Sequence, residues 1–360
     1  ATGESIGVVL LGRALQGAGA IAAVVMALAA DLTREEQRTK VMASIGMSIG
    51  MSFMIAMVAG PILNQWIGVP GIFGLTAVLA VLGIAVVIWV VPTPKVSRVH
   101  RDAQTVPAQL KGAIADSSLL RLDLGIFSLH FVLMSSFLVL PLILKGQFGF
   151  APSDHWQLYL SVLVLSVFLM VPFVILAEKY HQMKKVFVGA VLMIALSQFI
   201  LFFIHSSFWS LACVLLLFFI AFNLLESVLP SLISKIAPAQ SKGTAMGVYS
   251  TSQFFGTFLG GLLGGVVHQQ FNLHAVFILN ACVATVWLIV AFGMKNPRYL
   301  SNYLLNVGEL DEQHAAHLQV QLTQVRGVAE VVIMLDEGVA YLKVDKRALD
   351  LDALLAFSKS

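Results

Sequence analysis

Charged residues are scarce in this sequence. Only 11% of the 360 residues are charged and 58% are hydrophobic, whereas about a quarter of the residues in a soluble domain carry a charge. This deficit excludes an ordinary soluble protein and predicts a protein that crosses a membrane several times. The formal net charge of +3 implies no nucleic-acid partner, because basic loops of a membrane protein account for such an excess.

Cysteine is also nearly absent. Cys213 and Cys282 are the only two, and both lie inside apolar runs with no spacing typical of a metal or redox site. We interpret them as inert packing residues. The sequence shows no metal-ligand cluster, no nucleophile beside a base and no phosphate-binding loop. An enzyme, a cofactor and a metal site are therefore not predicted.

Long apolar runs dominate what remains. A hydrocarbon core about 30 Å thick needs about 20 helical residues, and nine stretches are long enough: residues 6–30, 41–66, 71–91, 122–144, 156–177, 186–204, 208–233, 243–267 and 273–294. Almost all loop lysines and arginines fall on one side of these spans, which the positive-inside rule makes cytoplasmic. We expect a multi-pass protein of the bacterial inner membrane with a cytoplasmic C-terminus.

The longest basic loop divides the chain unequally. It covers residues 92–121, with three spans before it and six after it. We therefore expect residues 1–91 to be the remainder of an N-terminal helix bundle that lacks about three helices. Residues 122–294 are predicted to form a six-helix C-terminal bundle, followed by a linker at 295–302.

Residues 303–360 have a different pattern. Strands at 303–309, 328–336 and 339–345 alternate with helices at 311–325 and 351–357, which predicts a small cytoplasmic ferredoxin-like domain. The order resembles that of heavy-metal-associated domains, but the first loop, 308–313, has no cysteine, so no thiolate metal site is expected. The domain is regulatory, docks on the membrane part or self-associates; an acidic solvated appendage is the alternative.

Three ionisable side chains lie deep inside spans. Arg13, His130 and Glu226 fall on the first, fourth and seventh spans, the period expected if one helix of each three-helix repeat lines a central cavity. Polar companions accompany them: Gln16, Asp123 and Asn223. Histidine titrates near neutral pH. We hypothesise that His130 and Glu226 form a proton site; structural hydrogen bonds between helices are the alternative. Helical rise places Arg13 nearer the outside.

Two spans carry stripes of small residues. The second contains Gly46, Gly50, Gly60 and Pro61, and the eighth contains Gly256, Gly260 and Gly264 at i+4 spacing. Such stripes let helix backbones approach closely in lipid. Helix packing is one interpretation, and a hinge or gating role is the other.

Several motifs resemble those of a known family. Residues 11–19, Leu-Gly-Arg-Ala-Leu-Gln-Gly-Ala-Gly, resemble the fourth-helix motif of the major facilitator superfamily. Residues 46–61 resemble its fifth-helix antiporter motif, although Ala56 stands where a glycine is usual. Residues 222–231 and 242–255 look closest to YajR-type transporters, which also end in a cytoplasmic ferredoxin-like domain.

The resemblance implies twelve helices in two bundles, alternating access and proton-coupled efflux of drugs or other small, amphipathic solutes. Helices one, four, seven and ten would line the cavity. Residues 177–185 resemble a degenerate form of the loop that latches the family's outward-facing state, so Glu178, Lys184 and Lys185 are the candidate latch residues. A solvated loop is the alternative. A membrane sensor built on a transporter scaffold, with the C-terminal domain as output, is the second functional hypothesis.

Overall fold

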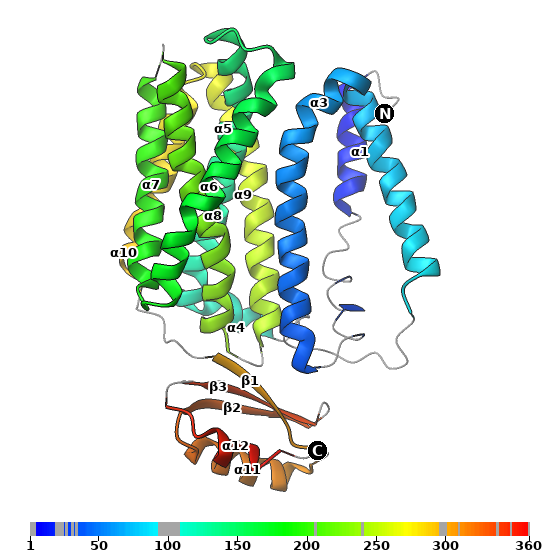
Figure 1. Cartoon of the computed structure of the whole chain (residues 1–360), viewed down its shortest axis with the longest axis vertical. Helices are drawn as coiled ribbons and strands as arrows, with labels where there is room; N and C mark the ends of the chain where they lie inside the picture. Colours follow the sequence, from blue (N-terminus) through cyan, green and yellow to red (C-terminus); the bar gives the residue numbers. More distant parts are fainter. Residues whose placement is uncertain are drawn as a thin grey trace.

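The structure, a computed structural model, describes residues 5–18, 25, 28–29, 32, 35–92, 109–204, 207–238, 241–294, 301–308, 310–335, 338–345 and 348–358. Figure 1 shows a bundle of long helices, further helices beside it, and a small domain of strands and helices at one end. The predicted fold class, a helical membrane part followed by a small α+β domain, is confirmed.

Among the described residues before the linker are the helices α1 (Ile6–Ala18) and α3 (Glu35–Trp89). α3 contains a break at Gly68, whose φ of 65° is a conformation that glycine adopts without the penalty of a Cβ atom. Figure 1 shows the two segments of α3 running in opposite directions. The predicted spans 41–66 and 71–91 therefore form a helical hairpin. The end of the predicted span 6–30 lies mostly outside the described residues.

Six long helices form the C-terminal bundle. They are α5 (Ser117–Gly146), α6 (His155–Glu178), α7 (Met183–Phe203), α8 (Phe208–Ile236), α9 (Lys242–Gln270) and α10 (Ala275–Phe292). The short α4 (Leu110–Ala115) precedes them, and η2 (Pro152–Asp154) lies between α5 and α6. Within the described chain, six helical stretches have the length and hydropathy to span a membrane, five of them in this bundle. The helix α9 has the length, but its glycine, serine, threonine and glutamine residues lower its hydropathy.

The two cysteines correct one prediction. Cys213 and Cys282 are both exposed on the bundle, not packed in its core. The error has a physical cause, because a membrane helix is apolar on its lipid-facing side as well as on its buried side. An apolar run therefore does not say which of its residues are buried.

The glycine stripe of α9 packs directly on α5. A Cβ atom built on Gly256 would overlap the backbone of Phe127, and one built on Gly260 would lie 2.8 Å from Phe131 Cα. At Gly264 the nearest atom is Ser135 Cβ, at 2.9 Å. Real Cβ atoms essentially never come within 3.0 Å of another heavy atom. The helix-packing interpretation of this stripe therefore describes a contact in which backbone meets backbone.

A buried polar network joins α5 to two other helices. Asn280 of α10 donates from Nδ2 to Ser136 Oγ and to Gln198 Oε1 of α7, each at 3.0 Å. Its Oδ1 accepts from Ser135 Oγ. All four side chains are at most 4% exposed. Buried polar groups that satisfy one another fix helices in a single arrangement, and this network does so for the helix that carries His130.

The C-terminal domain has the predicted element order. Strands β1 (Ser301–Asn306), β2 (Val328–Met334) and β3 (Val339–Val344) form an antiparallel sheet in the order β1-β3-β2. Helices α11 (Glu312–Gln324) and α12 (Leu351–Leu355) complete the βαββα unit. Leu322, Leu342 and Leu354 belong to the core between the sheet and these helices.

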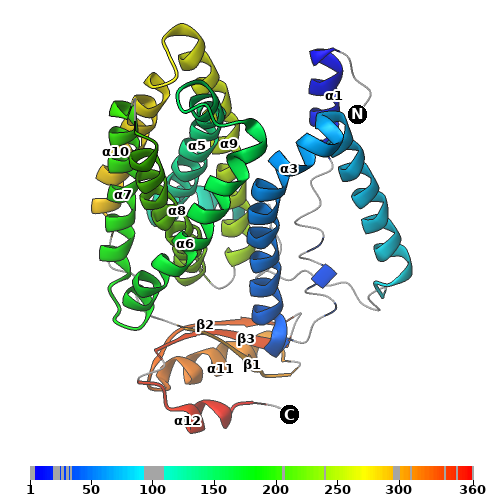
Figure 2. The same ribbon diagram turned by 45° about the horizontal axis from the view of Figure 1, so that its top comes forward.

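The opposite face of the sheet is turned toward the bundle. Figures 1 and 2 show the sheet lying between the long helices and α11 and α12. Every residue of β3 is buried, and Lys343 Nζ donates to the carbonyl oxygen of Ala237, the C-cap of α8. The same Nζ lies 3.6 Å from Glu330 Oε2. A helix C-terminus has free carbonyls and a partial negative charge, so it suits a lysine.

Candidate functional site

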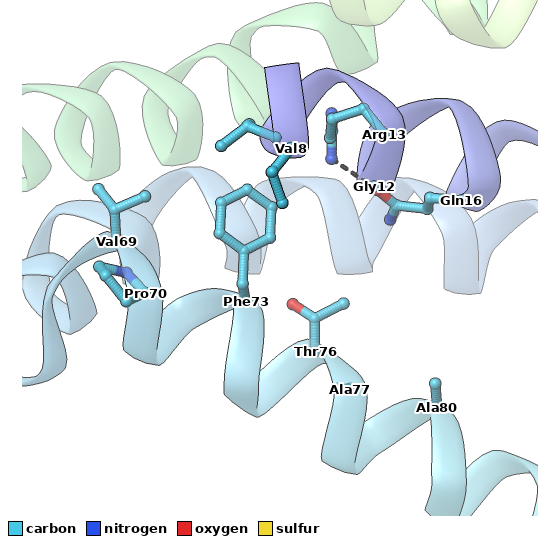
Figure 3. A pocket seen from close by; sticks show the side chains of 11 residues that line it. Val8, Gly12, Arg13, Gln16, Val69, Pro70, Phe73, Thr76, Ala77 and Ala80 are labelled. Carbon is cyan, nitrogen blue, oxygen red and sulfur yellow. Dashed lines mark hydrogen bonds between the residues drawn. The ribbon is translucent and has the colours of Figure 1, made fainter. Parts of the chain in front are cut away.

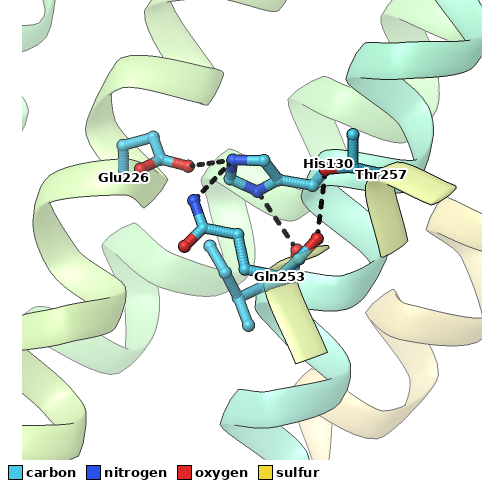
Figure 4. Close-up of polar contacts among 5 residues, drawn as sticks. His130, Glu226, Gln253 and Thr257 are labelled. Carbon is cyan, nitrogen blue, oxygen red and sulfur yellow. Dashed lines mark hydrogen bonds and ion pairs between the residues drawn. The ribbon is translucent and has the colours of Figure 1, made fainter. Parts of the chain in front are cut away.

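His130 and Glu226 meet inside the C-terminal bundle. His130 lies in the middle of α5 and Glu226 in the second half of α8, and His130 Nε2 is 3.3 Å from Glu226 Oε1 (Figure 4). The His130 side chain is 13% exposed, and Glu226 Oε1 has no contact with solvent. The depth of both residues in separate spans predicted them as site candidates. Only the structure brings them within hydrogen-bonding range of each other.

Two further contacts orient the imidazole ring. His130 Nδ1 lies 3.3 Å from the carbonyl oxygen of Ile126, one turn earlier in α5. Its Nε2 lies 2.8 Å from Gln253 Nε2 of α9. A carbonyl only accepts hydrogen bonds, so Nδ1 carries a hydrogen, and in the neutral ring Nε2 is then the acceptor. Gln253 was not predicted as a site residue, although it lies in the motif at residues 242–255, because an uncharged side chain inside a span carries no such signal.

Asp123 and Tyr249 lie near this pair. Asp123 is 5% exposed and Tyr249 is 4% exposed, and Tyr249 is within electrostatic range of both Asp123 and Glu226. Among the described residues, neither Asp123 Oδ1 nor the Tyr249 hydroxyl has a hydrogen-bond partner. Asp123 is six residues from the start of α5, and Tyr249 is seven residues from the start of α9. Both therefore lie between His130 and the end of the bundle that faces the C-terminal domain (Figure 1).

Asn223 does not join the pair. It precedes Glu226 by one turn on α8, but its Nδ2 donates to Ser166 Oγ of α6 at 2.9 Å. This bond ties α8 to α6 rather than to α5. Glu226 and Asn223 therefore point toward different neighbouring helices.

Arg13 and Gln16 lie in a separate place. Arg13 Nη1 donates to Gln16 Oε1 at 2.7 Å, on one face of α1. Both line a pocket of about 410 Å³ between α1 and the second segment of α3, together with Phe73 and Thr76 (Figure 3). The first segment of α3 lies between α1 and the C-terminal bundle (Figures 1 and 2). The structure thus brings His130 and Glu226 together but does not bring Arg13 to them.

The remaining candidate residues occupy helix ends and helix faces. Gly46 and Gly50 lie in the helix α3, but their burial and contacts are outside what the structure describes. A Cβ on Gly60, which precedes Pro61, would meet open space. The latch candidates lie where α6 ends and α7 begins. The Glu178 side chain lies outside the described part, Lys184 is half-buried and Lys185 is exposed. Their role as a latch stays a prediction.

In the ranges that the structure describes, no group of three or more histidine, cysteine, aspartate or glutamate residues is placed to hold a metal ion.

The pair of His130 and Glu226 has the groups to bind and release a proton. An imidazole and a carboxylate each have a protonated and an unprotonated form near physiological pH when their surroundings favour it.

Comparison with known proteins shows the family to which this chain belongs. The chain matches the Major Facilitator Superfamily model over residues 2–179 and 122–305. It is 46% identical over 350 residues to the "Inner membrane transport protein YajR" of Escherichia coli (strain K12), covering 96% of this chain and 76% of that protein. It is 34% identical over 302 residues to an uncharacterized transporter of Buchnera aphidicola subsp. Acyrthosiphon pisum, covering 82% and 76% of the two chains. The chain therefore belongs to the major facilitator superfamily.

Proposed function

We propose that this secondary transporter exports small, amphipathic solutes in exchange for protons by alternating access. Its place in a transporter family and its resemblance to an inner membrane transport protein support a multi-pass protein of the bacterial inner membrane. In the proposed orientation the C-terminal domain is cytoplasmic. The observation that carries the proposal is the contact between His130 Nε2 and Glu226 Oε1, which lie 3.3 Å apart between α5 and α8, with side chains 13% and 33% exposed.

The coupling follows from charge. A proton that binds the pair removes a negative charge from a buried site or creates a positive one, and a charge is costly in a membrane interior. The protonated and unprotonated pair therefore favour different exposures to water, and hence different conformations. A ligand shifts a conformational equilibrium only when it binds the two states with different affinity. If the solute and the proton bind different conformations, the movement of one down its gradient can drive the transport of the other.

The other candidates take supporting roles in this proposal. Asp123 lies between the pair and the end of α5 that faces the C-terminal domain, which suits a proton path to the cytoplasm. Arg13 and Gln16 supply polar groups to the pocket beside α1. Glu178, Lys184 and Lys185 would latch one state at the loop between α6 and α7.

Flux in liposomes tests the proposal. The full chain is reconstituted with an inside-acidic gradient, and uptake of ethidium, an amphipathic cation, is followed with proton release from the lumen. We expect gradient-driven uptake by the wild type. Glu226→Gln should lose this uptake yet keep exchange of ethidium across a membrane without a gradient. The control is Ser227→Ala, the next residue of α8, which is exposed and bonds only its own helix.

Two results would contradict the proposal. Retention of full gradient-driven uptake by Glu226→Gln would remove this carboxyl from the coupling. Absence of flux in the wild type for a panel of cationic and neutral amphipathic dyes, together with partner binding that depends on residues 303–360, would favour the sensor hypothesis. The contact of Lys343 with the end of α8 is the observation that favours this second function, since it links the C-terminal domain to the helix that carries Glu226.

A further inference from the structure

Gln253 contacts the proposed proton site from a third helix. Its Nε2 lies 2.8 Å from His130 Nε2, and Glu226 Oε1 lies 3.3 Å from the same ring nitrogen. Figure 4 shows the amide of Gln253 and the carboxylate of Glu226 both directed at this nitrogen. One nitrogen atom therefore has two polar partners with opposite hydrogen-bonding character.

The two partners suit different protonation states of the ring. In the neutral ring Nδ1–H donates to the Ile126 carbonyl, so the lone pair of Nε2 accepts the Gln253 N–H. In the protonated ring Nε2 carries a hydrogen and can only donate. The Glu226 carboxylate then supplies the acceptor. The Gln253 N–H loses its acceptor in that state, and its amide must rotate or withdraw.

We propose that Gln253 is a positioning residue that stabilises the neutral form of His130 and thereby sets the pH at which the pair exchanges its proton. The role in transport rests on the proposed function, whereas the effect on His130 itself does not. Because Glu226 already provides an acceptor for the protonated ring, the net contribution of Gln253 is the N–H that it gives to the neutral ring.

Among the described residues, few other polar or charged groups near His130 can influence the balance between its neutral and protonated forms. α8 contributes Glu226 and the Phe222 ring, whose centroid is 6.0 Å from that of His130. α9 contributes Gln253 and the Tyr249 hydroxyl, and α5 itself contributes Asp123, two turns from His130. At this level α10 approaches α5 through uncharged side chains, Asn280 and Trp287. The lysine of α4, Lys111, is exposed.

The backbone of α9 that carries Gln253 is held in place by its neighbours. About one and two turns further on, Gly256 and Gly260 hold α9 against the α5 backbone without intervening side chains. Thr257 Oγ1 also donates to the Gln253 carbonyl at 3.1 Å. The Gln253 side chain is therefore presented to His130 at a constant distance, and its response to protonation is a rotation of the amide rather than a shift of the helix.

The test measures the titration of His130 directly. The full chain is labelled with ¹⁵N-histidine in lipid nanodiscs, and the His130 signal is assigned by its loss in His130→Gln. Gln253→Met keeps the length of the side chain and removes its N–H. We expect the His130 titration midpoint to rise by about one pH unit, the size of one lost hydrogen bond. The control, Thr251→Val, removes an exposed hydroxyl of α9 that bonds the carbonyl of Gly247, and it should leave the midpoint unchanged.

An unchanged or lowered midpoint in Gln253→Met would overturn the inference. If that variant does not fold, Gln253→Leu tests the same loss of the N–H. An equal rise in Thr251→Val would also overturn it, because the effect would then follow from a general change in α9. If the midpoint rises in the variant while ethidium flux in the wild type shows no dependence on a proton gradient, the inference on His130 holds and the proposed function fails.

Discussion

At the contact between α5 and α9, the effect of a substitution on packing can be distinguished from its effect on helix propensity. The substitution Gly260→Ala places a methyl group against the α5 backbone, 2.8 Å from Phe131 Cα. The matched control is Gly261→Ala, the next residue of the same helix. Its methyl group would meet only Met134, at 3.5 Å from Cγ and 3.8 Å from Cε, and these atoms belong to a flexible side chain.

The expected magnitude follows from two opposing effects. Alanine is favoured over glycine in a helix by about 1 kcal/mol, and this gain is common to both variants. Overpacking a tight contact destabilises by about 1–3 kcal/mol, and this loss falls on Gly260→Ala alone, since backbone atoms cannot rotate away. The free energy of unfolding of Gly260→Ala should therefore be about 1–3 kcal/mol lower than that of Gly261→Ala.

Unfolding by sodium dodecyl sulfate in mixed micelles, followed by far-ultraviolet circular dichroism, measures this difference. Gly256→Ala should repeat the loss, because its methyl group would overlap the Phe127 backbone. Equal stability of the Gly260 and Gly261 variants would refute the packing argument. A loss of transport in Gly260→Ala without any loss of stability would instead support the hinge interpretation of the stripe.

Three more predictions concern the polar contacts. Asn280→Ala should lower the free energy of unfolding in the same assay by about 1–3 kcal/mol, because Gln198 and Ser135 would be left buried without this partner; no loss would show that the network is dispensable. Lys343→Met should speed amide hydrogen exchange in the last turn of α8, whereas Glu330→Gln, which keeps the bond to the Ala237 carbonyl, should not; equal exchange in both variants would argue against docking through Lys343. The His314 backbone N–H and ring nitrogen bond the Asp311 carboxylate and hold its pKa below the ordinary value of 3.8. Since the folded-state pKa is the lower one, the stabilisation is complete above the unfolded-state pKa and disappears as the pH falls through the folded-state pKa. Exchange protection of α11 should therefore differ between wild type and Asp311→Ala at pH 7, with the difference vanishing in strong acid; a difference that persists there would contradict the assignment.

Much of the architecture could be predicted from local sequence patterns. Apolar runs of sufficient length predicted the helices, because a backbone in lipid must satisfy its own hydrogen bonds and a helix does so within one segment. The short uncharged stretch at residues 67–70 predicted the turn that the structure places at Gly68. The alternation of short strands and helices after residue 302 predicted the βαββα domain. Each of these features depends on residues that are neighbours in the sequence.

The site depended on contacts between distant segments. His130 and Glu226 are 96 residues apart in the numbering, and depth in a span says nothing about the rotation of a helix about its axis. Arg13 has a similar signal in the sequence but lies beside α3, away from the pair. Gln253 and Tyr249 lie within the motif at residues 242–255, but neither carries a charge that would mark it as a site residue. By itself, therefore, the sequence determined which segments are helices or strands. Tertiary packing alone decided which polar groups meet, because the glycine contact of α9 and the Asn280 network set how α5 is turned toward its neighbours.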